Sequence, residues 1–185
     1  SLSPFIFINK LKHIIMSCIL ASGIALGCKD SLGGIKEAYI ASFSSATTYT
    51  YDSDDIIDTV TSGGNFFTFA QRNEQGEFTQ TGNHSVENGT NFWSQMVSLV
   101  FTKNDATNRN ILKVLAQSTL LIIVKDQNNL YWVVGESNGA DLTASTVGAG
   151  KAYGDLNGST VSFEGKESAP ARQMSQTAFD TLSVS

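Results

Sequence analysis

Short runs of alternating apolar and polar residues, separated by Gly-Gly and Asn-Gly pairs, cover most of the chain. Such alternation is typical of β-strands that bury one face, and the glycine-containing pairs between the runs mark turns. The first predicted strand spans residues 35–43, where Ile35, Tyr39, Ala41 and Phe43 form one apolar face.

The same signals predict further strands at residues 54–61, 66–70, 78–81 and 91–102, whereas the Ser/Thr/Tyr-rich segment 44–53 is expected to be a loop. In the longest of these strands the large apolar residues share one face: Trp93, Val97, Leu99 and Phe101.

One helix is expected directly after this long strand. Asn104 or Asp105 can cap its N-terminus, and it should end near residues 117–118. Its apolar stripe, at the spacing of a helix that packs on a sheet, consists of Ile111, Leu112, Val114 and Leu115.

The last third of the chain continues with strands. Residues 120–124 are apolar throughout, which predicts a central strand buried on both faces. A hairpin strand at 130–136 follows, then a Gly-rich arm between Asn138 and Asp155, and a strand at 159–167. The fold class predicted is mainly β, a β-sandwich or distorted barrel with one packed α-helix and extended N-terminal and Gly-rich arms.

Three parts are expected along the chain: an N-terminal arm at 1–34, a β-sandwich domain at 35–170, and a C-terminal tail at 171–185 with a short strand from 178 onward. The length of 185 residues suits a single domain with its own core.

The N-terminus allows two interpretations. A basic flank containing Lys10 and Lys12, the apolar stretch 14–26 and the lipobox-like residues 25–28 are typical of a bacterial lipoprotein signal, which would place a lipid on Cys28. The stretch 14–26 is shorter than the ~20 residues that a membrane-spanning helix needs. We favour an arm in which residues 1–30 lie against neighbouring subunits, with no membrane anchor, because an apolar segment left in water drives association.

Composition narrows the function classes. Charged residues make up only 16% of the chain, against about a quarter in ordinary soluble domains, so much of the surface is neutral and polar. The net charge of −5 and the absence of a basic run argue against a protein that grips a nucleic-acid backbone. Two cysteines, Cys18 and Cys28, can form at most one disulfide.

We expect no catalytic, cofactor-binding or metal-binding residues, and no enzyme activity. The acidic residues Asp52, Asp54, Asp55 and Asp58 do not have the spacing of a calcium loop and are interpreted as a solvated surface. His84 has no evident catalytic partner. The glycosylation-type sequons at Asn83, Asn88 and Asn157 are interpreted as turns, and Trp93 and Trp132 as core or interface residues rather than a sugar-stacking platform.

The order of these elements resembles that of the tail tube proteins of long-tailed phages. The resemblance covers residues 90–170, about half of the chain, and its most specific pieces are residues 121–128, 134–139, 154–158 and 163–170. Residues 28–34 (Cys-Lys-Asp-Ser-Leu-Gly-Gly) also resemble the opening of virion proteins from phages of Bacteroidetes hosts. The apolar N-terminal extension departs from the pattern of this family.

This resemblance implies a structural protein of the virion tail that assembles with itself and with other tail proteins. The subunits would form stacked rings of six around a channel through which DNA passes as a non-specific passenger. Two other hypotheses remain: another virion protein of this fold, such as a decoration, collar or tail-completion protein, and a surface lipoprotein or glycan-binding β-sandwich. If the protein forms a tube, the Gly-rich arm between Asn138 and Asp155 is expected to leave the subunit and pair with an adjacent copy by strand addition.

Overall fold

The computed structural model describes residues 23–61 and 64–185. The chain divides into two units, Ser1–Asp30 and Ser31–Ser185. Of the first unit, residues 23–30 are exposed and contain no helix or strand. Cys28 is a free, exposed thiol. Cys18 and most of the arm predicted to contact neighbouring subunits lie outside the described residues, so that contact stays a prediction.

The second unit is mainly β, as predicted, with eleven strands and two helices in its described residues, and its sheet does not close into a barrel. In chain order its elements are β1 (Ile35–Ser42), β2 (Thr48–Tyr51), β3 (Ile57–Thr61), β4 (Phe67–Ala70), β5 (Glu77–Ser85), β6 (Thr90–Thr102), α1 (Ala106–Leu115), β7 (Leu120–Asp126), β8 (Tyr131–Val134), β9 (Ala140–Gly148), β10 (Gly158–Glu167), β11 (Arg172–Met174) and α2 (Gln176–Asp180).

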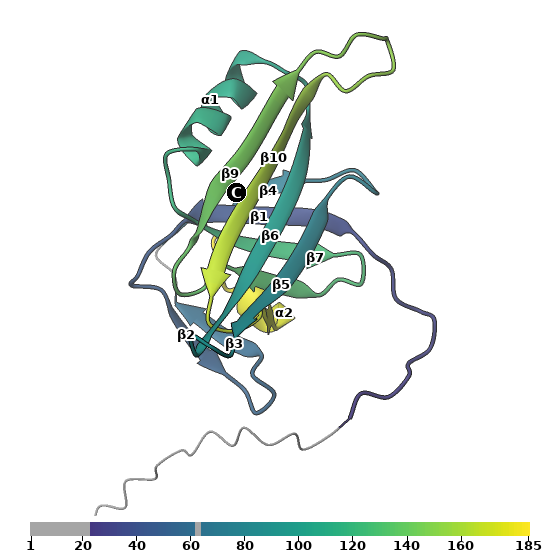
Figure 1. Ribbon diagram of the computed structural model, residues 1–185. Helices are drawn as coiled ribbons and strands as arrows, with labels where there is room; N and C mark the ends of the chain where they lie inside the picture. Colours follow the sequence, from purple (N-terminus) through teal and green to yellow (C-terminus); the bar gives the residue numbers. More distant parts are fainter. Residues whose placement is uncertain (1–22, 62–63) are drawn as a thin grey trace, which may run out of the picture. The chain divides into compact units, whose positions relative to one another are not determined.

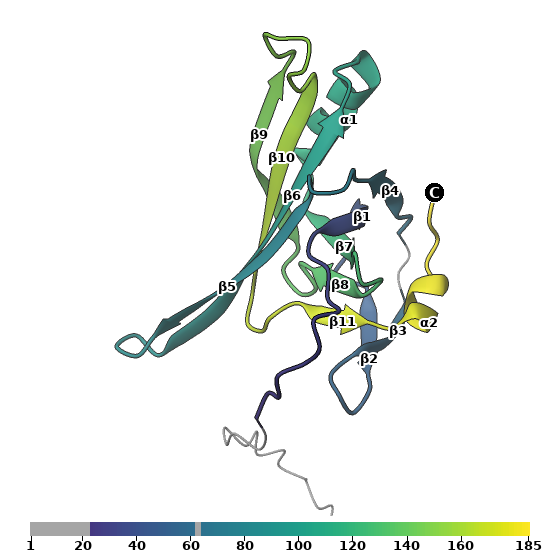
Figure 2. The same cartoon turned by 90° about the vertical axis from the view of Figure 1, so that its right-hand side faces the viewer.

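The hydrogen-bonded strands fold into two layers (Figures 1 and 2). We call the strands β9-β10-β6-β5 the long sheet, and the strands β4-β1-β7-β8-β11-β3-β2 the cross sheet, because β1 and β7 run across the long strands. The two sheets are joined through β9 and β7, which pair at a single position, Ala140 with Leu120. The remainder of β9 therefore leaves the cross sheet and belongs to the long sheet alone.

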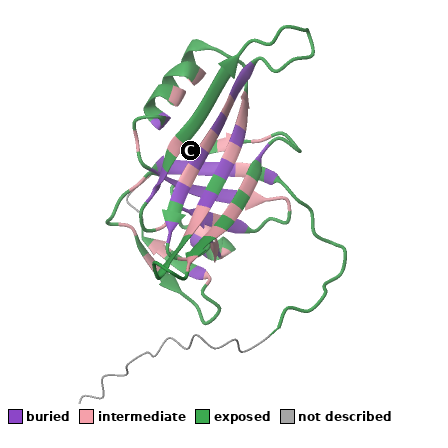
Figure 3. Ribbon diagram, in the orientation of Figure 1, coloured by how far each residue is buried: buried purple, intermediate pink, exposed green. Residues whose placement is uncertain are grey.

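Two apolar clusters fill the space on either side of β1 and β7. One lies between the sheets and includes Val97, Leu99 and Phe163 of the long sheet. The other lies between the cross sheet and α2 and includes Tyr131 and Met174. All five residues of the predicted central strand 120–124 are at most 3% exposed, which confirms that it is buried on both faces (Figure 3).

The single apolar face predicted for residues 35–43 is wrong. A register shift between Ile35 and Glu37 places Ile35 in the cluster between the sheets, whereas Tyr39 and Ala41 point into the other cluster. An inserted residue of this kind reverses the alternation of side chains beyond it. The intervening Ala38 and Ile40 are also buried, so β1 is a central strand with two apolar faces.

The helix after β6 begins where the sequence predicts. Asp105 is the N-cap and accepts a hydrogen bond from the Asn108 backbone N–H at 2.8 Å. The predicted apolar stripe, however, divides: Leu112 and Leu115 pack on the core, while Ile111 and Val114 are 38% and 61% exposed.

Three further expectations are corrected. The segment predicted as a loop, 44–53, contains strand β2, whose alternating Thr and Tyr residues pair with β3. A second helix, α2, is capped by the Ser175 side chain. The C-terminal segment is part of the domain, since Met174 and Ala178 are almost fully buried and β11 pairs with β8.

Most of the predicted Gly-rich arm is also an ordered strand. Residues 140–148 form β9, which pairs with β10 of the same chain, so they do not extend freely from the subunit. Only the connection 149–157 is outside a strand, and Asp155 fixes it by accepting the N–H groups of Lys151 and Ala152 at 2.8 Å each. These two bonds lower the pKa of Asp155. The arm was predicted from its glycines, whereas the β-branched Thr143, Thr146 and Val147 favour a strand.

Candidate functional site

The long sheet has two open edges. Strand β5 lies at one end of the strand order and pairs only with β6 among the described strands. Strand β9 at the other end pairs with β10 along its length, but with β7 only at Ala140, and residues 143–148 are exposed. Both edges therefore present backbone N–H and C=O groups that have no ladder partner within the described part of the chain.

The two edges are suited to one another. Each neighbouring pair in the long sheet is antiparallel, so β9 and β5 at its two ends run in opposite directions. If β5 of a second copy in the same orientation lies beside β9, the two strands are antiparallel and continue the pattern of the sheet. Monomeric β-proteins protect an edge with Lys or Pro, with a β-bulge, or with a covering element. Neither Lys nor Pro occurs in β5 or β9, and β9 has one bulge, at Thr143.

One face of the long sheet is turned away from the cross sheet. The side chains on this outer face are neutral or acidic. Residues paired across the strands on this face include Glu77, Thr79, Thr81, Ser94, Met96, Ser98, Val100, Asp141, Ala144, Thr146, Thr160, Ser162, Glu164 and Lys166. They comprise three carboxylates and one lysine, and Lys166 lies 3.9 Å from Glu164. The Ser94 hydroxyl donates to Glu164 at 2.6 Å. Such a face offers hydroxyl groups but little positive charge for a phosphate backbone.

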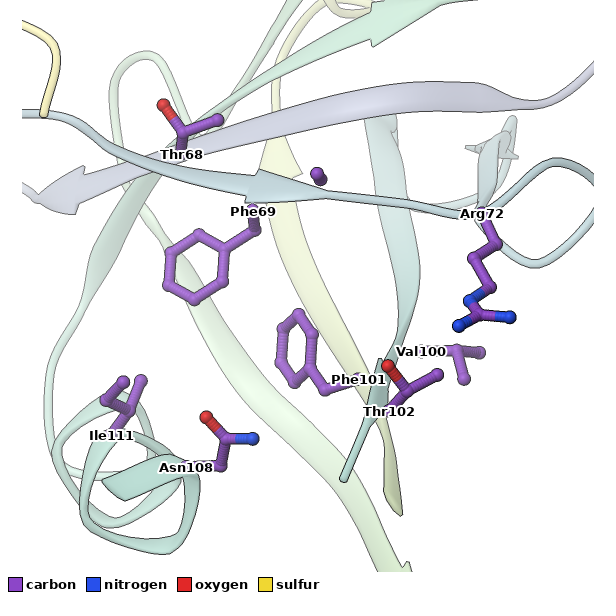
Figure 4. Close-up of a pocket in the computed structure, with 9 residues that line it drawn as sticks. Thr68, Phe69, Arg72, Val100, Phe101, Thr102, Asn108 and Ile111 are labelled. Atoms are coloured by element: carbon purple, nitrogen blue, oxygen red, sulfur yellow. The ribbon is translucent and has the colours of Figure 1, made fainter. Parts of the chain in front are cut away.

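A mostly apolar groove lies between α1 and β4, with a volume of about 530 Å³. Ile111 and Val114 of α1 line one side, and Phe67 of β4, which is 55% exposed, lines the other. A smaller hollow adjoins the groove and shares Thr68, Phe69 and Ile111 with it (Figure 4). The Phe69 and Phe101 rings, 5.4 Å apart, face this hollow, and Arg72 lies at its edge.

The acidic residues before β3 have structural roles. Asp52 accepts the backbone N–H groups of Asp54 and Ile56, both at 2.9 Å, and so closes the turn between β2 and β3. Asp55 forms an ion pair with Arg172 of β11 at 2.9 Å. Among the described residues, no group of three His, Cys, Asp or Glu side chains is arranged to hold a metal ion.

The other candidate side chains also contact their own domain. His84 Nδ1 lies 2.7 Å from Asn91 Oδ1 and its ring meets the edge of Trp93. Trp132 donates its Nε1–H to Asp126 at 3.3 Å and lies beside the Phe78 ring. In the part of the chain that the structure describes, no helix is long and apolar enough to cross a membrane.

Comparison of the chain with known protein families, with characterised proteins and with solved structures finds no match. The function of the protein is therefore inferred from the geometry of this domain.

Sequence reasoning missed both the open edge of β9 and the groove beside α1. The groove had no local signal, because residues that differ by about 100° in direction, such as Ile111 and Leu112, fit within the apolar stripe that a helix usually buries. The edge had no local signal, since it depends on β9 leaving β7 after a single pair.

Proposed function

We propose that this protein is a structural subunit of a phage tail tube. The observation that carries the proposal is the pair of open, oppositely directed edges on one four-stranded sheet. Joining the β5 edge of each copy to the β9 edge of the next gives a head-to-tail contact, and such contacts close into a ring when the rotation between copies allows it. The resemblance to tail tube proteins implies six copies per ring.

The ring has a chemical consequence for its channel. With the long sheets joined edge to edge, their outer faces line the inside of a continuous barrel of strands. A surface of hydroxyl groups and carboxylates does not bind DNA, because stable binding needs clustered Lys and Arg. DNA would pass along such a wall without adhering to it, as genome delivery through a tube requires.

The proposal is tested by measuring the assembly state of the purified full chain over a range of concentrations. Sedimentation and negative-stain electron microscopy are the two measurements. We expect rings and hollow stacks of constant diameter. A chain that remains monomeric at every concentration contradicts the proposal. Single rings that never stack favour a collar, decoration or tail-completion protein. A lipid on Cys28, detected by mass spectrometry of protein from bacterial cells, favours a surface lipoprotein.

A further inference from the structure

The chain contains three Asn-Gly pairs, which the fold holds in different ways: Asn88-Gly89, Asn138-Gly139 and Asn157-Gly158. In such a pair the glycine nitrogen can attack the side-chain amide of the asparagine, because glycine has no Cβ to obstruct the approach. The attack requires that the glycine N–H and the asparagine side chain are both free to move. The surroundings of each pair therefore decide whether it reacts in the folded protein.

Asn88 and Gly89 lie in the turn that joins β5 and β6. Beyond the pair of Trp93 with Glu167, where β10 ends, β5 and β6 continue as a two-stranded ribbon that projects from the body of the domain (Figure 2). The Asn88 side chain and the Gly89 N–H form no hydrogen bond with any other described residue. Both residues are exposed, and a Cβ on Gly89 would meet nothing within 4 Å. The end of such a ribbon opens at low free-energy cost.

The pair at Asn138 is held by hydrogen bonds on both residues. Asn138 Nδ2 donates to the Lys166 carbonyl at 2.8 Å, and the Asn138 backbone N–H donates to Glu167 Oε1 at 2.8 Å. The Gly139 N–H, which would have to attack, donates to the Gly135 carbonyl at 3.2 Å. These bonds have to break before the glycine nitrogen can reach the side chain.

The pair at Asn157 is restrained by the long sheet. The Asn157 carbonyl accepts from the Lys103 N–H at 2.8 Å. Gly158 is buried at the start of β10, where it pairs with Thr102 of β6 and with Gly148 of β9. Reaction at this pair requires the end of β10 to separate from both neighbouring strands.

We propose that Asn88 is a site of spontaneous deamidation in the folded protein. The Gly89 nitrogen loses its proton to base and attacks Cγ of Asn88, so that a C–N bond forms and the side-chain nitrogen leaves as ammonia. Water then opens the five-membered imide at either carbonyl, which gives aspartate or isoaspartate at position 88. The turn gains a negative charge beside the exposed Glu87. The reaction does not depend on the proposed ring.

Trypsin separates the three pairs, because cleavage after Lys and Arg releases them on peptides 73–103, 126–151 and 152–166. The native full chain is incubated at mildly alkaline pH and digested briefly at intervals. Mass spectrometry then measures in each peptide the mass gain that accompanies replacement of an amide by a carboxylate. We expect peptide 73–103 to react at least about tenfold faster than either of the others. In urea, which releases all three pairs, the three rates should become similar.

Asn88→Gln is the matched variant, because glutamine keeps the amide but closes the corresponding larger ring far more slowly. It should remove the reaction from peptide 73–103 and leave the melting temperature unchanged, since the ribbon lies outside both apolar clusters. A reaction that persists in this peptide would belong to another asparagine and overturn the proposal. Equal rates in the three native peptides, or a faster reaction at either other pair, would also overturn it. A preference for Asn88 that persists in urea would overturn the role given to the fold.

Discussion

Arg172 on β11 and Glu136 after β8 form an ion pair in which Nη1 of the arginine lies 3.0 and 2.9 Å from the two carboxylate oxygens. Asp55 accepts from Nε of the same guanidinium at 2.9 Å, and the Tyr51 ring lies 4.8 Å from its central carbon. Tyr51 also donates its hydroxyl to Glu136 at 2.5 Å. The cluster thus ties β2 and the turn before β3 to β11 and the end of β8.

Replacing Arg172 with Met should lower the free energy of unfolding by about 2 kcal/mol, because it leaves the nearly buried Glu136 carboxylate without its cation. Urea unfolding measures this. The control is Lys166→Met, whose ammonium is mostly exposed and 3.9 Å from Glu164. That variant should change stability by less than about 0.5 kcal/mol. Equal losses in the two variants would show that Arg172 has no special role.

The stability of the domain should decline at alkaline pH. Burial, followed by the hydrogen bond to Glu136, raises the pKa of Tyr51 from 10.0 to about 12. A group with a raised pKa in the folded state stabilises the fold fully below its unfolded pKa, and this contribution is lost as the pH rises through the folded pKa. The loss should therefore occur between about pH 10 and 12.

Urea unfolding at several pH values across this window measures the decline. Tyr51→Phe removes the ionisable group, so its stability should depend less on pH there. Some decline should remain, since burial also raises the pKa of Tyr39 and Tyr49. Tyr153→Phe is the control, because Tyr153 is fully exposed. A Tyr51→Phe profile that matches the native one would refute the assignment.

Substitution by alanine should affect the stability of the domain differently at two glycines, Gly135 and Gly148. Gly135 has a φ of +75°, and a Cβ there would lie 2.6 Å from the backbone carbon of Gly139. Gly135→Ala should cost roughly 2 kcal/mol or more. A Cβ on Gly148, at the end of β9, meets nothing within 4 Å, so Gly148→Ala should stay within about 0.5 kcal/mol. Thermal unfolding of the two variants compares them directly.

Proline at Ser145 and at Thr146 should separate folding from assembly. Consecutive N–H groups of a strand point to opposite sides, so one faces β10 and the other faces the open edge. Ser145→Pro and Thr146→Pro should therefore behave differently: one destabilises the domain, and the other keeps its melting temperature but prevents ring formation. Sedimentation and thermal melting identify the two. A variant that melts normally and still forms native rings, paired with one that unfolds, would exclude β9 as the joining edge.

The parts of this fold that sequence predicts well are those with a strong local pattern. The apolar run from Leu120 to Val124 and the cap at Asp105 needed no knowledge of distant residues, and both are confirmed. The Gly-rich segment was predicted wrongly because two local signals compete there. The glycines near residue 150 suggested an arm, whereas the β-branched residues before them favour a strand, and β10 supplies its partner.

The proposed assembly surface agrees only in part with the sequence prediction. Strand addition by the segment after Asn138 was expected from its glycines, and in the proposed ring the exposed edge of an ordered strand takes that role. The Arg172 cluster was not predicted, because Asp55 and Arg172 are 117 positions apart and no spacing links them. Contacts of this kind depend on topology, which periodicity does not encode.

The difference between the β5 and β9 edges gives any closed ring a direction. A ring built from unlike edges has no two-fold axis in its plane, so its upper and lower surfaces are chemically distinct. A stack in which the upper surface of each ring contacts the lower surface of the next is then polar, with a growing end and a starting end that cannot be exchanged. An initiating protein need match only one of these surfaces, and a terminating protein only the other, so both the direction and the length of the stack can be set from its ends.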